Sequence, residues 1–145
     1  MAGKKRVTAK DLNIKVDSKR ERDLFDWLMC VILFSKPVQQ ELAGEAFKVL
    51  RKNKVDSPNG LKKAGWQKIV NLLGEAHYVR YDESTATRLL EAGEKVQEEY
   101  DGRLKNLVDN CDSAAALKKR IQEFKGVGPK GAEIFMGEVG PVYFN

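Results

Sequence analysis

The segment FKGVGPKGA, residues 124–132, lies near the end of the 145-residue chain and constrains the fold most strongly. Its two glycines permit a tight turn at Gly126-Val127-Gly128, because glycine adopts a positive φ without a Cβ clash. Pro129 is well placed to open a helix after the turn, which would end near Gly140. Before the turn, apolar residues recur at helical spacing: Ala116, Leu117, Ile121 and Phe124. The pattern predicts two helices joined by a hairpin, with Val127 packed between them.

The rest of the chain carries the same helical spacing, and no stretch alternates as a half-buried strand would. Ser18 and Glu21 have the spacing of a capping box ahead of Leu24–Phe34, a run whose second half is apolar on almost all sides. We expect this run to be the central helix. Further helices are expected after Pro37, near Leu61, over Trp66–Gly74, from about Glu83 to Tyr100, over Leu104–Val108 and from Asp112 or Ser113 to Phe124. The fold class is therefore all-α: a single compact helical bundle that ends in a helix–hairpin–helix.

Charge and composition point to a globular domain with an anionic partner. The chain has 42% hydrophobic residues and a formal net charge of +5, which favours nucleic acid without proving it. We expect a flexible basic arm over residues 1–15 and one domain over residues 16–145. The cluster Lys4-Lys5-Arg6 in that arm is either a DNA-seeking element or a solvated tail.

Several classes of protein are disfavoured by the residue content. Cys30, Cys111 and the single histidine, His77, cannot supply the ligands of a zinc site or an iron–sulfur cluster. The apolar run Leu24–Phe34 contains Asp26 and is shorter than the ~20 residues that cross a bilayer. With no signal peptide visible, we expect a cytoplasmic, monomeric protein without a metal or a membrane anchor.

The backbone of the predicted hairpin can bind an anion. The backbone N–H groups of Gly128 and of the next helix's first turn have no intrahelical acceptors, so they can donate to a phosphate oxygen at the positive end of that helix. Pro129 has no N–H, so its neighbours must donate. Backbone donors of this kind hold a duplex without reading its bases. A plain tight turn is the alternative reading of two glycines.

This segment resembles the helix–hairpin–helix DNA glycosylase superfamily, and in particular its endonuclease III branch. Residues 124–132 are similar to the family signature Leu-Pro-Gly-Val-Gly-x-Lys-Thr-Ala. Leu24–Ser35 resembles the family's apolar helix, which ends in a serine before a DNA-facing loop. Gly74–Gly102 resembles the segment that leads toward the hairpin. The resemblance covers about residues 20 to 140 and implies the family's six-helix barrel.

The resemblance implies a DNA repair protein acting on double-stranded DNA with damaged or abasic sites. Lys130 falls where bifunctional members keep the lysine that attacks C1′ and forms a Schiff base. A lysine in the first turn of a helix is opposed by the helix dipole by ~0.3–1 kcal/mol, which hints at function; a solvated lysine touching phosphate is the alternative. A monovalent cation at the hairpin would fit the family. The DNA-binding positions carried over are Lys125, Gly126, Val127, Gly128, Gly131, Ser35, Lys36 and Gln39.

Departures from the family pattern leave other readings open. The family's catalytic aspartate lies beyond the second hairpin helix, and this sequence ends at Asn145 before it; the cluster-binding cysteines are absent as well. Lys125 and Gly131 replace the usual proline and threonine. Glu138 is an acid on the last helix, but its spacing does not make it a substitute. A non-catalytic DNA-binding module and a helical protein-interaction domain are therefore the alternatives to a glycosylase or abasic-site lyase.

Overall fold

The computed structural model describes residues 6–144, which contain helices and no strand. The all-α fold is therefore confirmed. None of the described helices is both long and apolar enough to cross a membrane. The helices are α1 (Glu21–Phe34), α2 (Gln40–Lys52), α3 (Pro58–Glu75), α4 (Asp82–Glu99), α5 (Leu104–Asp109), α6 (Ala114–Ile121) and α7 (Pro129–Tyr143), preceded by the 3-10 turns η1 (Lys10–Leu12) and η2 (Val16–Ser18).

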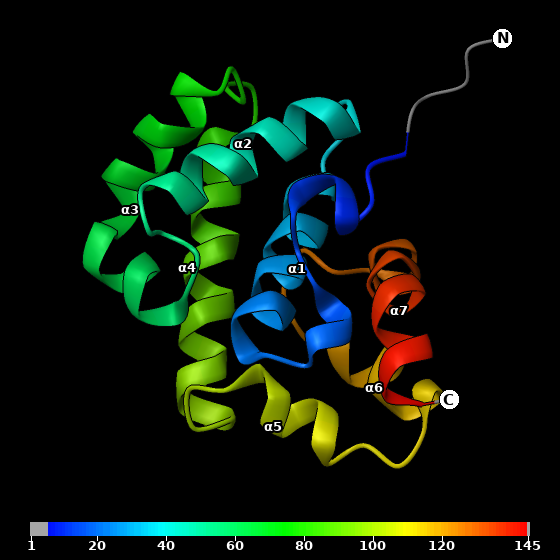
Figure 1. Cartoon of the computed structure of the whole chain (residues 1–145). Coiled ribbons are helices and arrows are strands. Elements are labelled where there is room, and N and C mark those ends of the chain that lie inside the picture. The colour runs from blue at the N-terminus through cyan, green and yellow to red at the C-terminus, as the bar shows by residue number, and fades with distance from the viewer. Residues whose placement is uncertain (1–5, 145) are drawn as a thin grey trace, which may run out of the picture.

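The first α-helix is the centre of the molecule. Every residue from Asp23 to Leu33 is buried, as the apolar run predicts. Helices α2, α4, α5 and α7 all pack against α1, and in Figure 1 it lies between the pair α3 and α4 on one side and α7 on the other. Since α1 ends at Phe34 and α7 begins at Pro129, this packing brings the first loop after α1 close to the hairpin.

The boundaries of several elements follow local turn chemistry. Gly65 breaks α3 with φ 82° and ψ 164°, which is the break that its place in the sequence predicts. Ser113 caps α6 by accepting a hydrogen bond from the Ala116 N–H. Helix α2 begins at Gln40 rather than at Pro37, because a turn closed by Val38 N–H and the Lys36 carbonyl at 2.7 Å follows α1.

The capping box expected from Ser18 and Glu21 is wrong. The N-cap of α1 is Arg20, and it makes no side-chain cap. Ser18 Oγ instead donates to Asp23 at 3.0 Å. Glu21 turns outward and accepts the N–H groups of Leu104 and Lys105 at 2.8 and 2.7 Å. It therefore satisfies the free amides at the start of α5, a long-range contact that no local spacing indicates.

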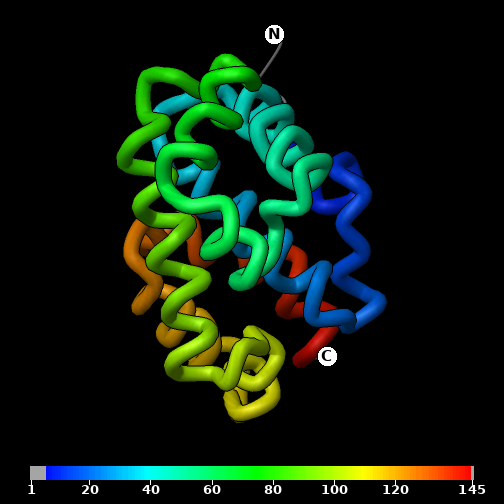
Figure 2. The backbone as a smooth tube through the Cα atoms, turned by 90° about the vertical axis from the view of Figure 1, so that its left-hand side faces the viewer, coloured from blue at the N-terminus to red at the C-terminus, as the bar shows by residue number. Residues whose placement is uncertain are grey.

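The flexible arm expected over residues 1–15 is wrong for its described part. Within residues 6–16, the apolar side chains are buried against the core: Val7, Ala9, Leu12, Ile14 and Val16. Two 3-10 turns carry the chain along one side of the molecule from α2 toward the end of α7, as Figure 2 shows. Burial of these side chains offsets the entropy of ordering the segment. Lys4 and Lys5 lie outside the described residues.

A polar cluster of Asp26, Arg51 and Asp56 is buried beside α1. Asp26 is fully buried, and its Oδ2 lies 3.1 Å from Arg51 Nη2. Asp26 Oδ1 and Asp56 Oδ2 are also buried, and neither oxygen accepts a hydrogen bond from residues 6–144. Burial above all, and then the Asp56 carboxyl, raise the pKa of Asp26 to about 8, against the lowering effect of Arg51. Arg22 Nε lies 3.9 Å from Asp56 Oδ2, which is too far for a hydrogen bond.

Candidate nucleic-acid interface

The hairpin between α6 and α7 has the backbone that its glycines predict. Gly126 has φ +92°, in the left-handed region that favours glycine. A Cβ there would approach the Arg88 side chain at 3.4 Å. Gly128 has an ordinary extended conformation (φ −92°, ψ −168°), and a Cβ on it would meet nothing within 4 Å. Gly126 is thus required by the turn, whereas Gly128 leaves the outer face of the hairpin open.

Val127 packs inside the hairpin, as the sequence predicts. It is 4% exposed, and its N–H donates to the Phe124 carbonyl at 3.0 Å. A Cβ added at Gly131 would lie 3.5 Å from Val127 and 3.4 Å from Val31 of the central helix. The tip of the turn is therefore held against α1, and the hairpin has a fixed position relative to the core.

Three backbone amides at the start of α7 are free. The first helical bond runs from the Ala132 N–H to the Gly128 carbonyl at 2.9 Å. The N–H groups of Gly128, Lys130 and Gly131 have no acceptor within residues 6–144. They lie at the positive end of a 15-residue helix, where a bound anion would complete their hydrogen bonding.

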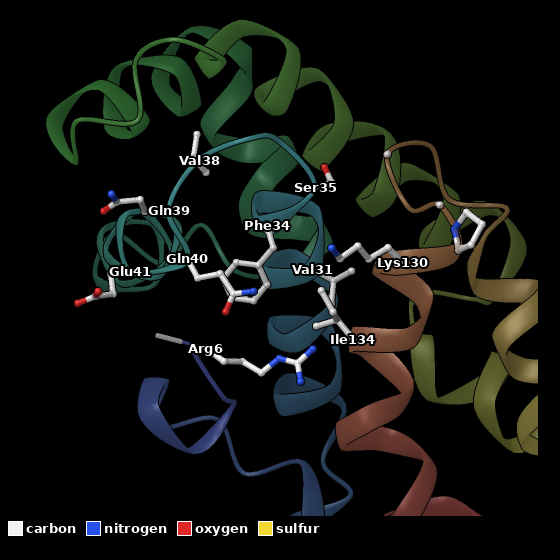
Figure 3. Close-up of a pocket in the computed structure, with 14 residues that line it drawn as sticks. Arg6, Val31, Phe34, Ser35, Val38, Gln39, Gln40, Glu41, Lys130 and Ile134 are labelled. Atoms are coloured by element: carbon white, nitrogen blue, oxygen red, sulfur yellow. The ribbon is translucent and has the colours of Figure 1, made fainter. Parts of the chain in front are cut away.

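A cavity of about 830 Å³ lies beside these amides (Figure 3). One wall comes from the loop after α1 and includes Ser35, Val38 and Gln39. The other wall comes from the hairpin and the start of α7, and its lining residues are Gly126, Gly128, Pro129, Lys130, Gly131 and Ile134. The structure therefore brings together two segments about 90 residues apart in sequence, both of which the sequence singles out.

Lys130 is the basic side chain of the hairpin wall. It is exposed, it lines the cavity, and it has no acidic partner among residues 6–144. Figure 3 shows its side chain extending from the start of α7 toward the central helix, with the amine near Val31 and pointing in the direction of Phe34. The amine is thus available to a ligand in the cavity.

Two of the loop residues predicted for DNA binding also line the cavity. The Ser35 hydroxyl donates to the Ile32 carbonyl at 2.6 Å and closes the last turn of α1. Gln39 is the N-cap residue of α2, and its carbonyl accepts the Ala43 N–H at 3.1 Å. The Gln39 side chain is exposed and has no protein partner in the described part of the chain. Of the two, only Gln39 presents an unused polar group.

Three predicted residues do not line the cavity: Lys36, Lys125 and Val127. Lys36 Nζ lies over the Tyr81 ring, 5.6 Å from its centroid. Lys125 Nζ lies 3.5 Å from Glu91 Oε2 on α4, although its side chain remains 69% exposed. Both lysines therefore have partners within the chain, and Val127 has a packing role.

Carboxylates are scarce around Lys130. Glu41, in the first turn of α2, is the one acidic residue among the described residues that line the cavity. Figure 3 shows its carboxylate turned away from Lys130. Glu138 does not line the cavity, because its Oε2 accepts the Ala9 N–H at 3.0 Å. Glu138 therefore has a structural partner within the chain.

Arg6 belongs to the basic cluster that the sequence offers as a DNA-seeking element, but its place beside the hairpin was not predicted. It lines the cavity together with Lys130, although 124 positions separate the two in sequence. Its basic character was visible in the sequence, but its place was not, since the segment was expected to be a flexible arm. The apolar residues from Val7 to Val16 are the signal that could have shown a packed segment.

Metal ligands are not gathered at this site. Within residues 6–144, no group of three or more histidine, cysteine, aspartate or glutamate side chains could hold a metal ion. Cys30 is buried in α1, and Cys111 is half-buried; both are free thiols. The monovalent cation expected at the hairpin stays a prediction.

Comparisons with models of protein families, with curated proteins and with solved structures gave no match to this chain. The resemblance to the helix–hairpin–helix glycosylases thus remains an interpretation of the residues quoted above.

Proposed function

We propose that the protein binds double-stranded DNA at the hairpin cavity and cleaves the strand at abasic sites, with Lys130 as the nucleophile. One observation carries the proposal. The glycine hairpin and the loop after α1, which the family resemblance connects to it, line a single cavity into which the unpaired Lys130 side chain extends. This is the arrangement that the resemblance to DNA glycosylases implies.

Free donors support DNA binding at this place. The amides of Gly128, Lys130 and Gly131 have no protein acceptor within residues 6–144, and a phosphate oxygen would complete their hydrogen bonds. Nothing within 4 Å of the added Gly128 Cβ position obstructs the outer face of the turn, so a strand can approach the backbone closely. Such contacts position a duplex and release counterions.

The chemistry requires only the lysine amine, an aldehyde and proton transfer through water. The neutral amine of Lys130 attacks C1′ of the ring-opened abasic sugar, and the carbinolamine loses water to form an iminium ion. Loss of a proton from C2′ then breaks the C3′–O bond and releases the 3′-phosphate as the leaving group. Water hydrolyses the remaining Schiff base and regenerates the amine. An abasic sugar needs no base excision, so this activity depends less on the family's aspartate than glycosylase activity does.

Borohydride trapping on duplex DNA with an abasic site tests the proposal, because borohydride reduces the iminium ion to a stable covalent adduct. We expect an adduct with the wild-type protein and none with Lys130→Ala. Lys68→Ala is the matched control, since Lys68 is an exposed lysine of α3 outside the cavity. Undiminished trapping by Lys130→Ala would exclude the assigned nucleophile.

The second candidate is a DNA-binding module without catalysis. The observation that favours it is the lack of a well-placed acid: Glu138 is bound to Ala9, and the Glu41 carboxylate turns away from Lys130. This candidate predicts salt-dependent binding to duplex DNA with no covalent adduct at any abasic site. Either candidate implies a protein that acts where DNA is, in the cytoplasm and, in a prokaryotic cell, on the nucleoid.

A further inference from the structure

The N-terminal segment, residues 6–16, connects the two walls of the cavity. The Val7 N–H donates to Gln40 Oε1 at 2.7 Å, and Gln40 belongs to the first turn of α2, directly after the loop wall. The Ala9 N–H donates to Glu138 Oε2 at 3.0 Å, and Glu138 belongs to α7, the helix of the hairpin wall. Two amides only two positions apart are therefore attached to elements from opposite sides of the cavity.

Packing holds this segment in place as firmly as the hydrogen bonds do. Val7 and Ala9 are 8% and 2% exposed. Farther along, Arg51 Nη1 donates to the Leu12 carbonyl at 2.7 Å. Arg6 directly precedes these fixed residues, so the backbone from which its side chain projects is anchored at the edge of the cavity.

Unlike the residues that follow it, Arg6 is not held by packing or by a hydrogen bond of its side chain within residues 6–144. Its side chain is exposed, lines the cavity and has no acidic partner among residues 6–144. Figure 3 shows the guanidinium group of Arg6 reaching toward Ile134 of α7, on the same side of the central helix as the Lys130 amine. Two cations from distant parts of the chain thus enter one cavity and remain unpaired.

We propose that Arg6 binds a phosphate of the DNA strand that the hairpin amides hold, so that the N-terminal segment is part of the nucleic-acid interface. The inference rests on the proposed function and adds a binding residue to it. A guanidinium group suits this place because its planar donors bind phosphate oxygens in a bidentate manner. Its contact positions the strand and does not take part in the lysine chemistry.

The binding test uses the whole 145-residue chain and fluorescence anisotropy with a labelled duplex containing a reduced abasic site, which has no aldehyde and is not cleaved, titrated from 50 to 200 mM salt. We expect Arg6→Ala to weaken binding about tenfold and to reduce the slope of log K against log salt by about 0.9, the change for one lost phosphate contact. Arg6→Lys should recover part of the affinity. Lys10→Ala is the charge-matched control, because Lys10 is exposed in the same segment but does not line the cavity.

The outcomes separate the two proposals. Wild-type protein that binds no duplex overturns the proposed function. Wild-type protein that binds with a normal salt slope, while Arg6→Ala keeps the same affinity and slope, overturns only the role of Arg6. An equal loss in Lys10→Ala would also overturn it, since net charge alone would then explain the effect.

The hydrogen bond from the Ala9 N–H to Glu138 allows a second and independent test. Glu138→Leu removes the acceptor of the Ala9 amide, whereas Glu138→Gln removes the same negative charge and keeps an acceptor. If anchoring places Arg6, Glu138→Leu binds DNA more weakly than Glu138→Gln, and adding Arg6→Ala to Glu138→Leu causes little further loss. Equal affinity of the two Glu138 variants would contradict the anchoring, because loss of charge alone changes both in the same direction.

Discussion

The cavity at the hairpin and the buried cluster of Asp26, Arg51 and Asp56 use charged side chains in opposite ways. In the cluster, Arg51 is bound by the Asp26 carboxyl and by the carbonyls of Leu12 and Asn13. In the cavity, Arg6 and Lys130 are exposed and have no acidic partner within the described residues. The charges of the cluster are paired with each other inside the chain, and those of the cavity are left available to a ligand.

Charges that stabilise the fold are thus distinguished from charges that are available for binding by their burial and their partners. A buried charge must be paired and hydrogen-bonded, because desolvation costs several kcal/mol. An exposed lysine at a helix N-terminus gains nothing for stability, since the helix dipole opposes it. We therefore expect substitutions in the cluster to change stability and substitutions in the cavity to change DNA binding.

The largest effect is expected from Arg51→Leu. The substitution removes the guanidinium group that pairs with the buried Asp26 carboxyl and donates to the carbonyls of Leu12 and Asn13, so the free energy of unfolding should fall by about 3–5 kcal/mol. Urea denaturation followed by circular dichroism measures this loss. Lys48→Ala on the same helix is the control: its pair with Glu45 is exposed, so the loss should stay within about 1 kcal/mol. If Arg51→Leu lowers the free energy of unfolding by less than about 1 kcal/mol, Arg51 contributes no more to stability than an exposed ion pair does.

Stability should also depend on pH through Asp26. The folded protein keeps the Asp26 proton up to a pKa of about 8, whereas the unfolded chain loses it near the ordinary value of 3.8. Folding therefore takes up a proton between these values, and the contribution of Asp26 to stability falls as pH rises from about 4 to about 8. The steepest slope for one proton is about 1.4 kcal/mol per pH unit.

Asp26→Asn isolates this dependence. An asparagine side chain has the shape of the carboxyl group, can still accept the hydrogen bond from Arg51 and does not ionise. The difference in unfolding free energy between the variant and the wild type, measured by urea denaturation from pH 5 to pH 8, should grow in favour of the variant as pH rises. Parallel pH profiles for the two proteins would show that Asp26 is ionised throughout.

A smaller effect is expected at the hairpin, where Gly126→Ala and Gly128→Ala form a matched pair. Alanine at position 126 must adopt φ +92°, which costs about 1–2 kcal/mol. Alanine at position 128 adopts its native φ of −92° without strain and meets no neighbour within 4 Å. Thermal unfolding should therefore separate the two variants, with Gly128→Ala close to the wild type.

The same two glycine variants test whether DNA binds at the outer side of the hairpin. The Cβ in Gly128→Ala would stand on the open outer side of the turn, so we expect weaker DNA binding by a protein of normal stability. Anisotropy with a duplex measures the change. Unchanged affinity in Gly128→Ala would place the strand away from this backbone.

The smallest effect is expected on the free energy of unfolding when Lys130 is replaced. Lys130→Ala should leave the free energy of unfolding unchanged or raise it by about 0.3–1 kcal/mol, because the positive charge is removed from a helix N-terminus. Urea denaturation at low ionic strength is the sensitive measurement. A clear loss of stability would show that Lys130 has a structural partner and would remove the contrast with Arg51.

Sequence reasoning was most successful where neighbouring residues decide the structure. The helical spacing, the break at Gly65 and the packing of Val127 were predicted and are confirmed, and Ser113 is the one of two predicted caps that the structure shows. It failed where a residue of a local pattern makes its hydrogen bonds to other groups instead. Ser18 and Glu21 match a capping box, yet the one binds Asp23 and the other accepts the amides at the start of α5.

By itself, the sequence determined that this chain is helical and that a glycine hairpin precedes its last helix, because backbone conformation and the spacing of apolar residues act over a few positions. Only the tertiary structure decided that Arg6 and Lys130 enter one cavity and that Glu138 is engaged by Ala9. Those contacts join residues more than 120 positions apart, and they arise from packing of the N-terminal segment and α7 around a common core.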